Sequence, residues 1–157
     1  QRQMCIRDRM NIVCSASAIK AAEYLKEKFG TPYEIEYPQS CLPEEIVQKA
    51  DNFTDKNVLV IHNQTAADAV RKLITEKSGK CHCTSATFFM QKKELLQQGD
   101  IFLADESDLC DNVGDNYDVV IADKTLRRVM KNFSGEFIDF PHFGLSGRLL
   151  QGESEKI

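Results

Sequence analysis

The sequence lacks any long hydrophobic run. Charged residues make up 28% of the 157 positions, and the uncharged stretch 81–91 still carries threonine, serine and histidine. A helix that spans a membrane needs about 20 consecutive, predominantly apolar residues. The sequence therefore predicts no membrane span.

Basic clusters are also missing. Lys and Arg number 20 against 24 Asp and Glu, which gives a net charge of -4. Proteins that follow a phosphate backbone gather Lys and Arg on one surface. The composition therefore disfavours nucleic acid as a partner.

The sequence also lacks the motifs that mark a nucleotide-binding site or a serine hydrolase. The patterns GxGxxG and GxxxxGK[ST] are absent, so a conventional dinucleotide or nucleoside triphosphate site has no support. The GxSxG pattern of α/β serine hydrolases is absent as well. If the protein is a redox enzyme, its electrons must come through a cluster and a partner protein.

The first nine residues, QRQMCIRDR, lack the apolar core of a secretory signal. They resemble a translated sequencing adapter, so we interpret residues 1–9 as an artefactual leader and expect the true chain to begin upstream. Without their three Arg and one Asp, 17 basic residues face 23 acidic ones, a net charge of -6. Five cysteines then remain, an odd number without regular scaffold spacing, which predicts a reducing, cytoplasmic compartment.

From Met10 onward, short β-branched runs alternate with helical stretches, as in β-α units on a parallel sheet. Hydrophobic residues make up 42% of the chain, enough for a real core. We expect strands at 11–14, 33–37, 57–61, 80–87, 101–103, 117–122 and 137–140. We expect helices at about 18–29, 43–53, 65–74, 91–98 and 124–130. The fold class predicted is α/β, with Rossmann-like parallel sheets flanked by helices.

Details of three helices follow from their sequences. The first presents Ala22, Leu25 and Phe29 on one face, and Gly30 ends it. Thr65 is the expected cap of the third helix. The acidic stretch 105–111 lacks the spacing of a calcium-binding loop, which indicates a solvated helix face or a loop.

Cys14 follows the first expected strand and precedes a helix, at the place where open α/β sheets bind ligands. A helix N-terminus favours the thiolate, which acts as a nucleophile or as a ligand to soft metals and iron-sulfur clusters. A small buried residue at a strand end is the alternative interpretation of Cys14.

The segment 11–32, NIVCSASAIKAAEYLKEKFGTP, is similar to the middle segment of nitrogenase component 1 proteins. In that family a strand, a helix and an E-K-aromatic-G-x-P turn follow in this order. A family cysteine that binds the catalytic metal-sulfur cofactor precedes the glycine by the 16 residues that separate Cys14 from Gly30. The segments NVLVIHNQTAADAVRKLI and YDVVIAD resemble strands and a helix of the family's last domain, so the resemblance covers most of 10–150.

The resemblance implies two metal ligands. Cys14 would be an iron ligand. His142 lies in the loop FPHFGLSGR, which is similar to the family loop whose histidine also binds the cofactor, and imidazole is a good iron ligand. Independently of the resemblance, the guanidinium of Arg148 is a candidate to hold an anionic cofactor arm or a carboxylate. The alternatives are a packed loop histidine for His142 and a surface salt bridge for Arg148.

The implied protein is a fragment of a nitrogenase component 1-like oxidoreductase with an iron-sulfur or metal-sulfur cluster. Its partners would be an ATP-driven iron-sulfur reductase and a related component 1 subunit. The implied domains are the end of a middle Rossmann-like domain at 10–54 and a complete last domain at 55–150, before a frayed tail at 151–157. The alternatives are a non-catalytic assembly scaffold and an α/β binding module without metal.

Other polar residues are interpreted as structural. Cys81 and Cys83 share one face of a strand while His82 points away, which predicts two buried cysteines rather than a metal site. His62 ends a strand, and we interpret it as a capping or solvent-facing residue, with a place in the cleft as the alternative. Asp123 is predicted to be a helix N-cap.

Overall fold

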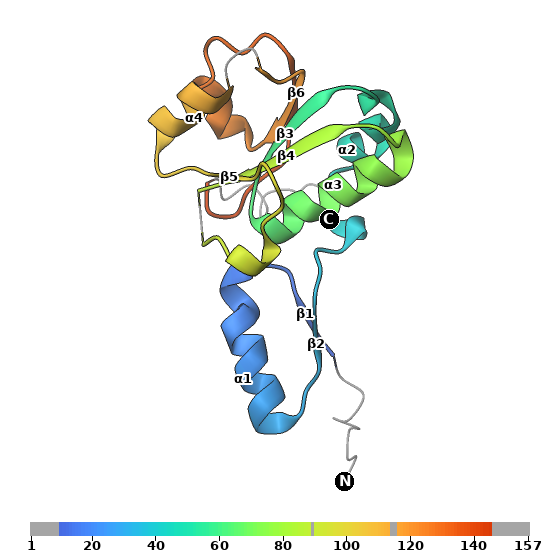
Figure 1. The fold of residues 1–157 in the computed structure, drawn as a ribbon, viewed down its shortest axis with the longest axis vertical. Helices are drawn as coiled ribbons and strands as arrows, with labels where there is room; N and C mark the ends of the chain where they lie inside the picture. The colour runs from blue at the N-terminus through green and yellow to red at the C-terminus, as the bar shows by residue number, and fades with distance from the viewer. Residues whose placement is uncertain (1–9, 89, 114–115, 146–157) are drawn as a thin grey trace, which may run out of the picture.

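The computed structural model describes residues 10–88, 90–113 and 116–145. Within them, the strands form a larger five-stranded sheet and a smaller two-stranded one, which lies beneath it in Figure 1, and helices pack around them. The predicted leader 1–9, Arg148 and the tail 151–157 lie outside the described residues. None of the described helices has both the length and the apolar character needed to span a bilayer.

The larger sheet is entirely parallel, as the sequence predicts. Its strands are β3 (Asn57–Ile61), β4 (His82–Thr87), β5 (Ile101–Phe102), β6 (Val119–Ala122) and β7 (Glu136–Asp139). They are ordered β5-β4-β3-β6-β7. The chain therefore proceeds outward from β3 in one direction and then returns to build the other half from β6. This doubly wound order places a topological switch point between β3 and β6.

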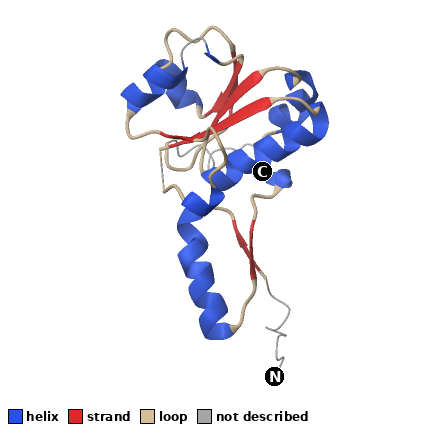
Figure 2. Ribbon diagram, in the orientation of Figure 1, coloured by secondary structure: helices blue, strands red, loops and turns tan. Residues whose placement is uncertain are grey.

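Both faces of this sheet are buried, which explains its near-continuous apolar strands. On one face Val58, Val60 and Ile121 pack against α2 (Glu44–Lys49) and α3 (Gln64–Ser78). On the other, Leu59 and Ile61 pack with residues of α4 (Glu106–Val113) and the 3-10 turn η7 (Lys124–Arg128). Figure 2 shows the helices on either side of the red strands.

The small unit consists of β1 (Asn11–Val13), the 3-10 turn η2 (Ala16–Ala18), α1 (Ile19–Phe29) and the parallel strand β2 (Tyr33–Ile35). Gly30 ends α1 with a φ of 70°, as predicted. Only the N-terminal half of α1 is well buried, and its buried side chains are Ile19 and Ala22. Leu25 and Phe29, on the expected inward face, are 37% and 63% exposed, because the two short strands do not extend beneath them.

Three local predictions are corrected by the structure. Asn63, not Thr65, caps α3, because the Asn63 side chain accepts a hydrogen bond from the Ala66 N–H. The helix expected at 91–98 is only the 3-10 turn η5 (Lys93–Leu95), because Lys92 is held in an extended conformation. The helix expected at 124–130 is the 3-10 turn η7.

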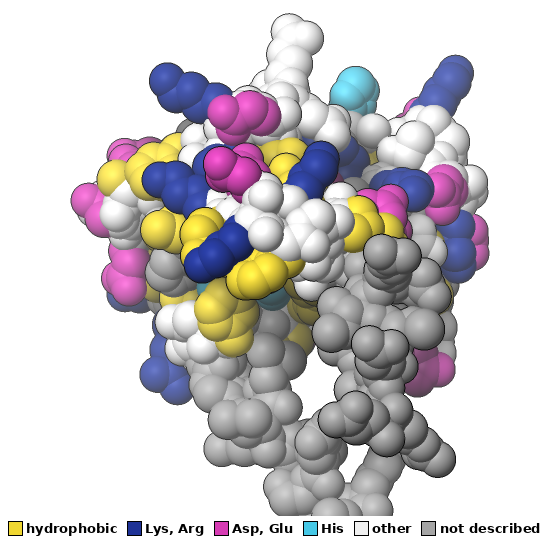
Figure 3. All heavy atoms as spheres, turned by 90° about the horizontal axis from the view of Figure 1, so that it is seen from below, with side chains coloured by type: hydrophobic (Ala, Val, Ile, Leu, Met, Phe, Trp, Pro, Cys, Tyr) yellow, Lys and Arg dark blue, Asp and Glu magenta, His cyan; other side chains and the backbone are white. Residues whose placement is uncertain are grey.

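The segment before β3 packs on the larger sheet. Leu42, Ile46 and Phe53 belong to the same buried cluster as the side chains of α3 and β3. The domain division near residue 54 stays a prediction. On the face seen in Figure 3, Lys and Arg side chains are interspersed with Asp and Glu between apolar side chains.

Candidate functional site

A crevice lies where the small unit meets the carboxyl edge of the larger sheet. The loops after β3, β6 and β7 all leave this edge, because the three strands are parallel neighbours. A cavity of about 220 Å³ opens there, and we call it the crevice. It is lined by Ser15, Ser17, Asn63, Met90 and His142, together with Phe143 and Gly144. Ligands of doubly wound sheets bind at such an edge.

Cys14 is the residue between β1 and the serines of the crevice. Its thiol is exposed, so the buried interpretation is wrong. The backbone around it is fixed, because the Thr65 hydroxyl donates to the Cys14 carbonyl and the Ser15 side chain caps η2. The structure therefore presents an accessible thiol beside the crevice and next to a short helical turn.

His142 is held from two sides. Its backbone N–H donates to Asp123 Oδ2 at 2.9 Å, and its Nδ1 accepts from the Gly144 N–H at 3.0 Å. Because a backbone N–H can only donate, the neutral ring carries its proton on Nε2. The side chain is 2% exposed, and burial lowers the pKa of His142, which keeps it neutral at pH 7.

His62 is buried, not solvent-facing, because three aromatic rings cover it. Its ring stacks on Phe140 with centroids 4.1 Å apart, lies 4.5 Å from the His142 ring, and meets Tyr37 edge-on at 6.4 Å. Nε2 lies 3.2 Å from the Pro141 carbonyl oxygen. A carbonyl only accepts, so Nε2 carries the proton and Nδ1 has the lone pair.

The surroundings of His62 disfavour its charged form. Burial, followed by the nearby His142, lowers the pKa of His62 from 6.5 to about 4. Nδ1 is shielded from solvent, and among the described residues no donor reaches it. His62 is thus a neutral base whose acceptor nitrogen is not used within the described part of the chain.

Asp123 connects two of the strand ends. As predicted it caps a helical turn, because its carboxylate accepts from the Thr125 N–H at 2.9 Å. The same buried carboxylate accepts from the His142 N–H, so it fixes the start of the loop after β7. Asp123 therefore positions His142 in addition to capping η7.

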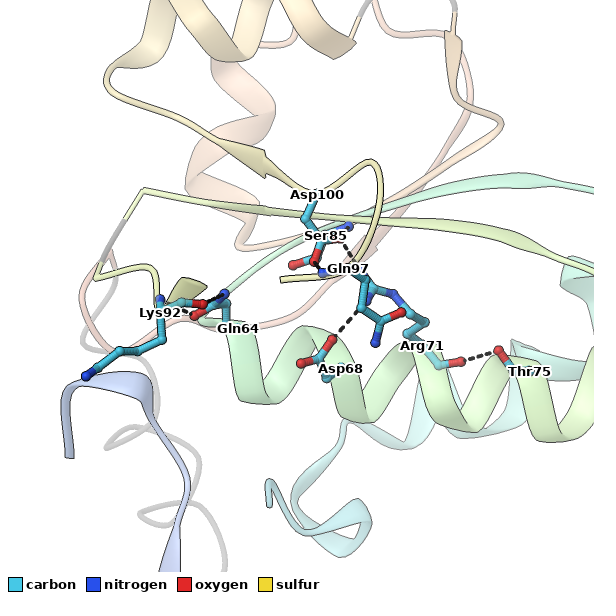
Figure 4. Close-up of polar contacts among 8 residues, drawn as sticks. All are labelled: Gln64, Asp68, Arg71, Thr75, Ser85, Lys92, Gln97 and Asp100. Atoms are coloured by element: carbon cyan, nitrogen blue, oxygen red, sulfur yellow. Dashed lines mark hydrogen bonds and ion pairs between the residues drawn. The ribbon is translucent and has the colours of Figure 1, made fainter. Parts of the chain in front are cut away.

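The segment between β4 and β5 forms another wall of the crevice through Met90, and two polar contacts hold it in place. The Gln64 amide donates to the Lys92 carbonyl at 3.0 Å and accepts from the Lys92 N–H at 2.8 Å (Figure 4). The Arg71 guanidinium pairs with Asp100, whose carboxylate also accepts from the backbone of β4. Both contacts tie the wall to α3.

Comparisons with known proteins bear on the fold. No family model matches the sequence, and a search of curated proteins finds no relative. A solved structure of nitrogenase Cp1 at pH 6.5 matches with a TM-score of 0.52 and 15% sequence identity. The chain has a nitrogenase-like fold. The match covers 85% of this chain but 38% of the nitrogenase chain, so the likeness concerns the fold of one part of that protein.

The nitrogenase-like fold raises the question of whether the residues suit a metal-sulfur cluster. The exposed Cys14 thiol does, because thiolate is the preferred ligand of iron-sulfur clusters. His142 does not in this arrangement, because its Nδ1 is occupied by Gly144 and its Nε2 carries a proton. Among the described residues, no group of three or more His, Cys, Asp and Glu side chains is placed to hold a metal ion.

The remaining sequence candidates lie at β4 and on α4. Cys81 and Cys83 are partly buried against the larger core while His82 is exposed. Burial raises the pKa of Cys83 to about 12, so this thiol stays protonated. The acidic stretch forms α4.

Two residues that line the crevice, Asn63 and Met90, were not predicted from the sequence as site residues. Asn63 had a local signal, since a cap residue directly after a parallel strand lies at the ligand-binding edge. Met90 had none, because its place depends on the contact between Gln64 and Lys92 across 28 residues.

Proposed function

We propose that the chain is part of a nitrogenase component 1-like protein that binds a prosthetic group in the crevice. The observation that carries this proposal is the cavity of about 220 Å³ at the carboxyl edge of a nitrogenase-like sheet, with the exposed Cys14 thiol beside it. The volume suits part of a larger group shared with neighbouring protein rather than a complete buried cofactor.

Cys14 is the residue we assign to the group. As a thiolate it binds iron, and the preceding strand and the Thr65 contact fix its backbone. When bound, an iron-sulfur or metal-sulfur cluster would supply the electron-transfer chemistry. Ser15, Ser17 and Asn63 offer polar contacts, and Met90 and Phe143 offer exposed apolar ones. Arg148, outside the described residues, stays a predicted contact for an anionic part.

The finer proposal concerns the whole protein. It is a cytoplasmic oxidoreductase whose electrons come from an ATP-driven iron-sulfur reductase, and it assembles with a related component 1 subunit. The chain spans 38% of the nitrogenase chain it matches, so these partners are proposed for the whole protein. An assembly scaffold would bind the same group without turning over a substrate.

A second candidate is an α/β binding module without metal. The arrangement of His142 favours it, because both ring nitrogens of that residue are unsuited to a metal in this structure. In that case Cys14→Ala changes little, since an exposed side chain contributes little packing.

The test is iron and acid-labile sulfide analysis with electron paramagnetic resonance. The full-length protein is produced anaerobically together with its genomic neighbours, as wild type, Cys14→Ala and Cys110→Ala. Cys110 is a matched control because it is also exposed but lies on α4. We expect a cluster signal in the wild type and Cys110→Ala that changes or disappears in Cys14→Ala. A folded wild-type protein without iron contradicts the proposal and leaves the metal-free module.

A further inference from the structure

We propose that the crevice binds an uncharged, planar aromatic molecule of one or two rings, which stacks on Phe143. The inference goes beyond the proposed function, because it names a ligand for the crevice itself. The Cys14 thiol is exposed beside the crevice but is not among the described residues that line it. A group on that thiol and a molecule in the crevice would therefore be neighbours, and the inference holds whether or not Cys14 binds a cluster.

A column of rings leads from the core of the larger sheet to the crevice. Phe140, which is buried, stacks on His62 with ring centroids 4.1 Å apart. The His142 ring lies 4.5 Å from that of His62 and stacks on Phe143 at 4.8 Å, with 17° between the last two planes. Phe143 is 62% exposed. The column therefore ends on a ring that is packed on one face and accessible on its remaining surface.

The loop that carries Phe143 is fixed on both sides of that residue. The His142 N–H donates to the buried Asp123 carboxylate, and the Gly144 N–H donates to His142 Nδ1. A ring that is held in place before the ligand arrives loses little conformational freedom on binding, which favours affinity. Phe143 is thus a prepared surface for a second ring.

Met90 forms another wall of the crevice and is 70% exposed. Its thioether adapts to the shape of a neighbour and makes favourable contacts with aromatic rings. Gln64 holds the segment just beyond it, through the Lys92 backbone. One exposed apolar side chain would be ordinary, but Met90 and Phe143 border the same cavity, and such a concave apolar surface is typical of a ligand site.

Charge and volume narrow the class of ligand. Within the described part of the chain, the crevice is lined by no charged side chain, and burial lowers the pKa of His142, which is therefore neutral at pH 7. An ion would lose its water here without gaining a counter-charge, so the crevice favours an uncharged molecule. A cavity of about 150 Å³ holds benzene, so about 220 Å³ suits one or two rings.

A second cavity provides an internal comparison. It has a volume of about 230 Å³, and β2 and α3 contribute to its walls. Four of its lining residues are charged, namely Glu34, Glu36, Asp68 and Lys72. The two cavities are similar in size, so volume alone does not select an uncharged ring. That selection follows from the lining of the crevice.

The first experiment measures the binding of 2-naphthol, an uncharged molecule of two fused aromatic rings, to the full-length protein by calorimetry at pH 7. The variants are Phe143→Leu, which stays apolar but loses the ring, and Phe102→Leu. Phe102 is the matched control, because it is 52% exposed but lies on β5. We expect Phe143→Leu to bind about two- to tenfold more weakly, the effect of one lost aromatic stack, and Phe102→Leu to bind as the wild type does.

Two analogues test the chemistry of the ligand. Decahydro-2-naphthol has the same carbon skeleton without planar rings, and 2-naphthoate carries a negative charge, so both should bind more weakly than 2-naphthol. Methionine labelled with ¹³C in its methyl group tests the place, because the ring current of the ligand should shift the Met90 resonance and leave that of Met10 unchanged. Equal binding of either analogue, or a shift of Met10 alone, would overturn the inference.

The inference and the proposed function fail separately. A full-length protein that lacks iron but binds 2-naphthol ends the cluster proposal and leaves the aromatic site. A protein that carries a cluster but shows no saturable binding of 2-naphthol, or binds it equally well as Phe143→Leu, ends the aromatic site. If the wild type forms a dimer that Phe143→Leu disrupts, and 2-naphthol does not bind, the crevice is an interface between two copies and the inference is wrong.

Discussion

Acid should destabilise this protein through His62. The pKa of His62 is lowered to about 4 in the folded chain, mainly by burial, against 6.5 when unfolded. Between these values the unfolded chain binds a proton that the folded chain does not. The contribution of neutral His62 to the free energy of unfolding is therefore fully present above pH 6.5 and is lost as the pH falls toward 4. The pKa difference corresponds to about 3 kcal/mol.

The assay is urea unfolding at a series of pH values from about 7.5 to 4.5, on the wild type and His62→Phe. Phenylalanine retains the stack on Phe140 but cannot be protonated, so carboxylates that titrate in the same range cancel in the comparison. The wild type should lose about 2 to 3 kcal/mol more than the variant over this range.

His82→Gln is the matched control, because His82 is exposed. Its unfolding free energy should follow the wild type at every pH. The lowered pKa of His142 adds a change of the same sign in both proteins. Parallel pH profiles of the wild type and His62→Phe would refute the reasoning.

Three further predictions concern other parts of the site. Gln64→Ala leaves a backbone N–H and a carbonyl of the facing wall without their partner, so urea unfolding should show a loss of about 1 to 3 kcal/mol, with exposed Gln98→Ala near zero. Asp123→Ala removes the cap of η7 and the acceptor of the His142 N–H. The free energy of unfolding in urea should therefore fall by about 2 kcal/mol or more. An unchanged urea midpoint would contradict this prediction. Mass spectrometry after alkylation of the native chain should find Cys14 modified rapidly and Cys83 only after unfolding, because burial raises the pKa of Cys83 to about 12; equal rates would show that the core around Cys83 opens readily.

The sequence predicts the strands well, because an apolar run between turn residues is a local signal. The strand β3 begins and ends as expected, at Asn57 and Ile61. The helix expected at 91–98 fails for a non-local reason, since the Gln64 side chain holds the Lys92 backbone extended from 28 residues away.

The candidate site follows the same division. The position of Cys14 after a strand is local and was predictable, whereas its exposure depends on how the small unit meets the larger sheet. The burial of His62 was not predictable, because the rings that cover it come from residues 37, 140 and 142, beyond the reach of any periodic pattern.

The contrast between the two histidines shows what a fold-level likeness carries over. At 15% identity the parallel sheet is retained, because many apolar side chains satisfy the same two-faced burial. The state of a ring nitrogen depends instead on one acceptor or donor, such as the Pro141 carbonyl for His62 or the Gly144 N–H for His142. Ligand assignments therefore follow from the hydrogen bonds of this chain and not from its resemblance to nitrogenase.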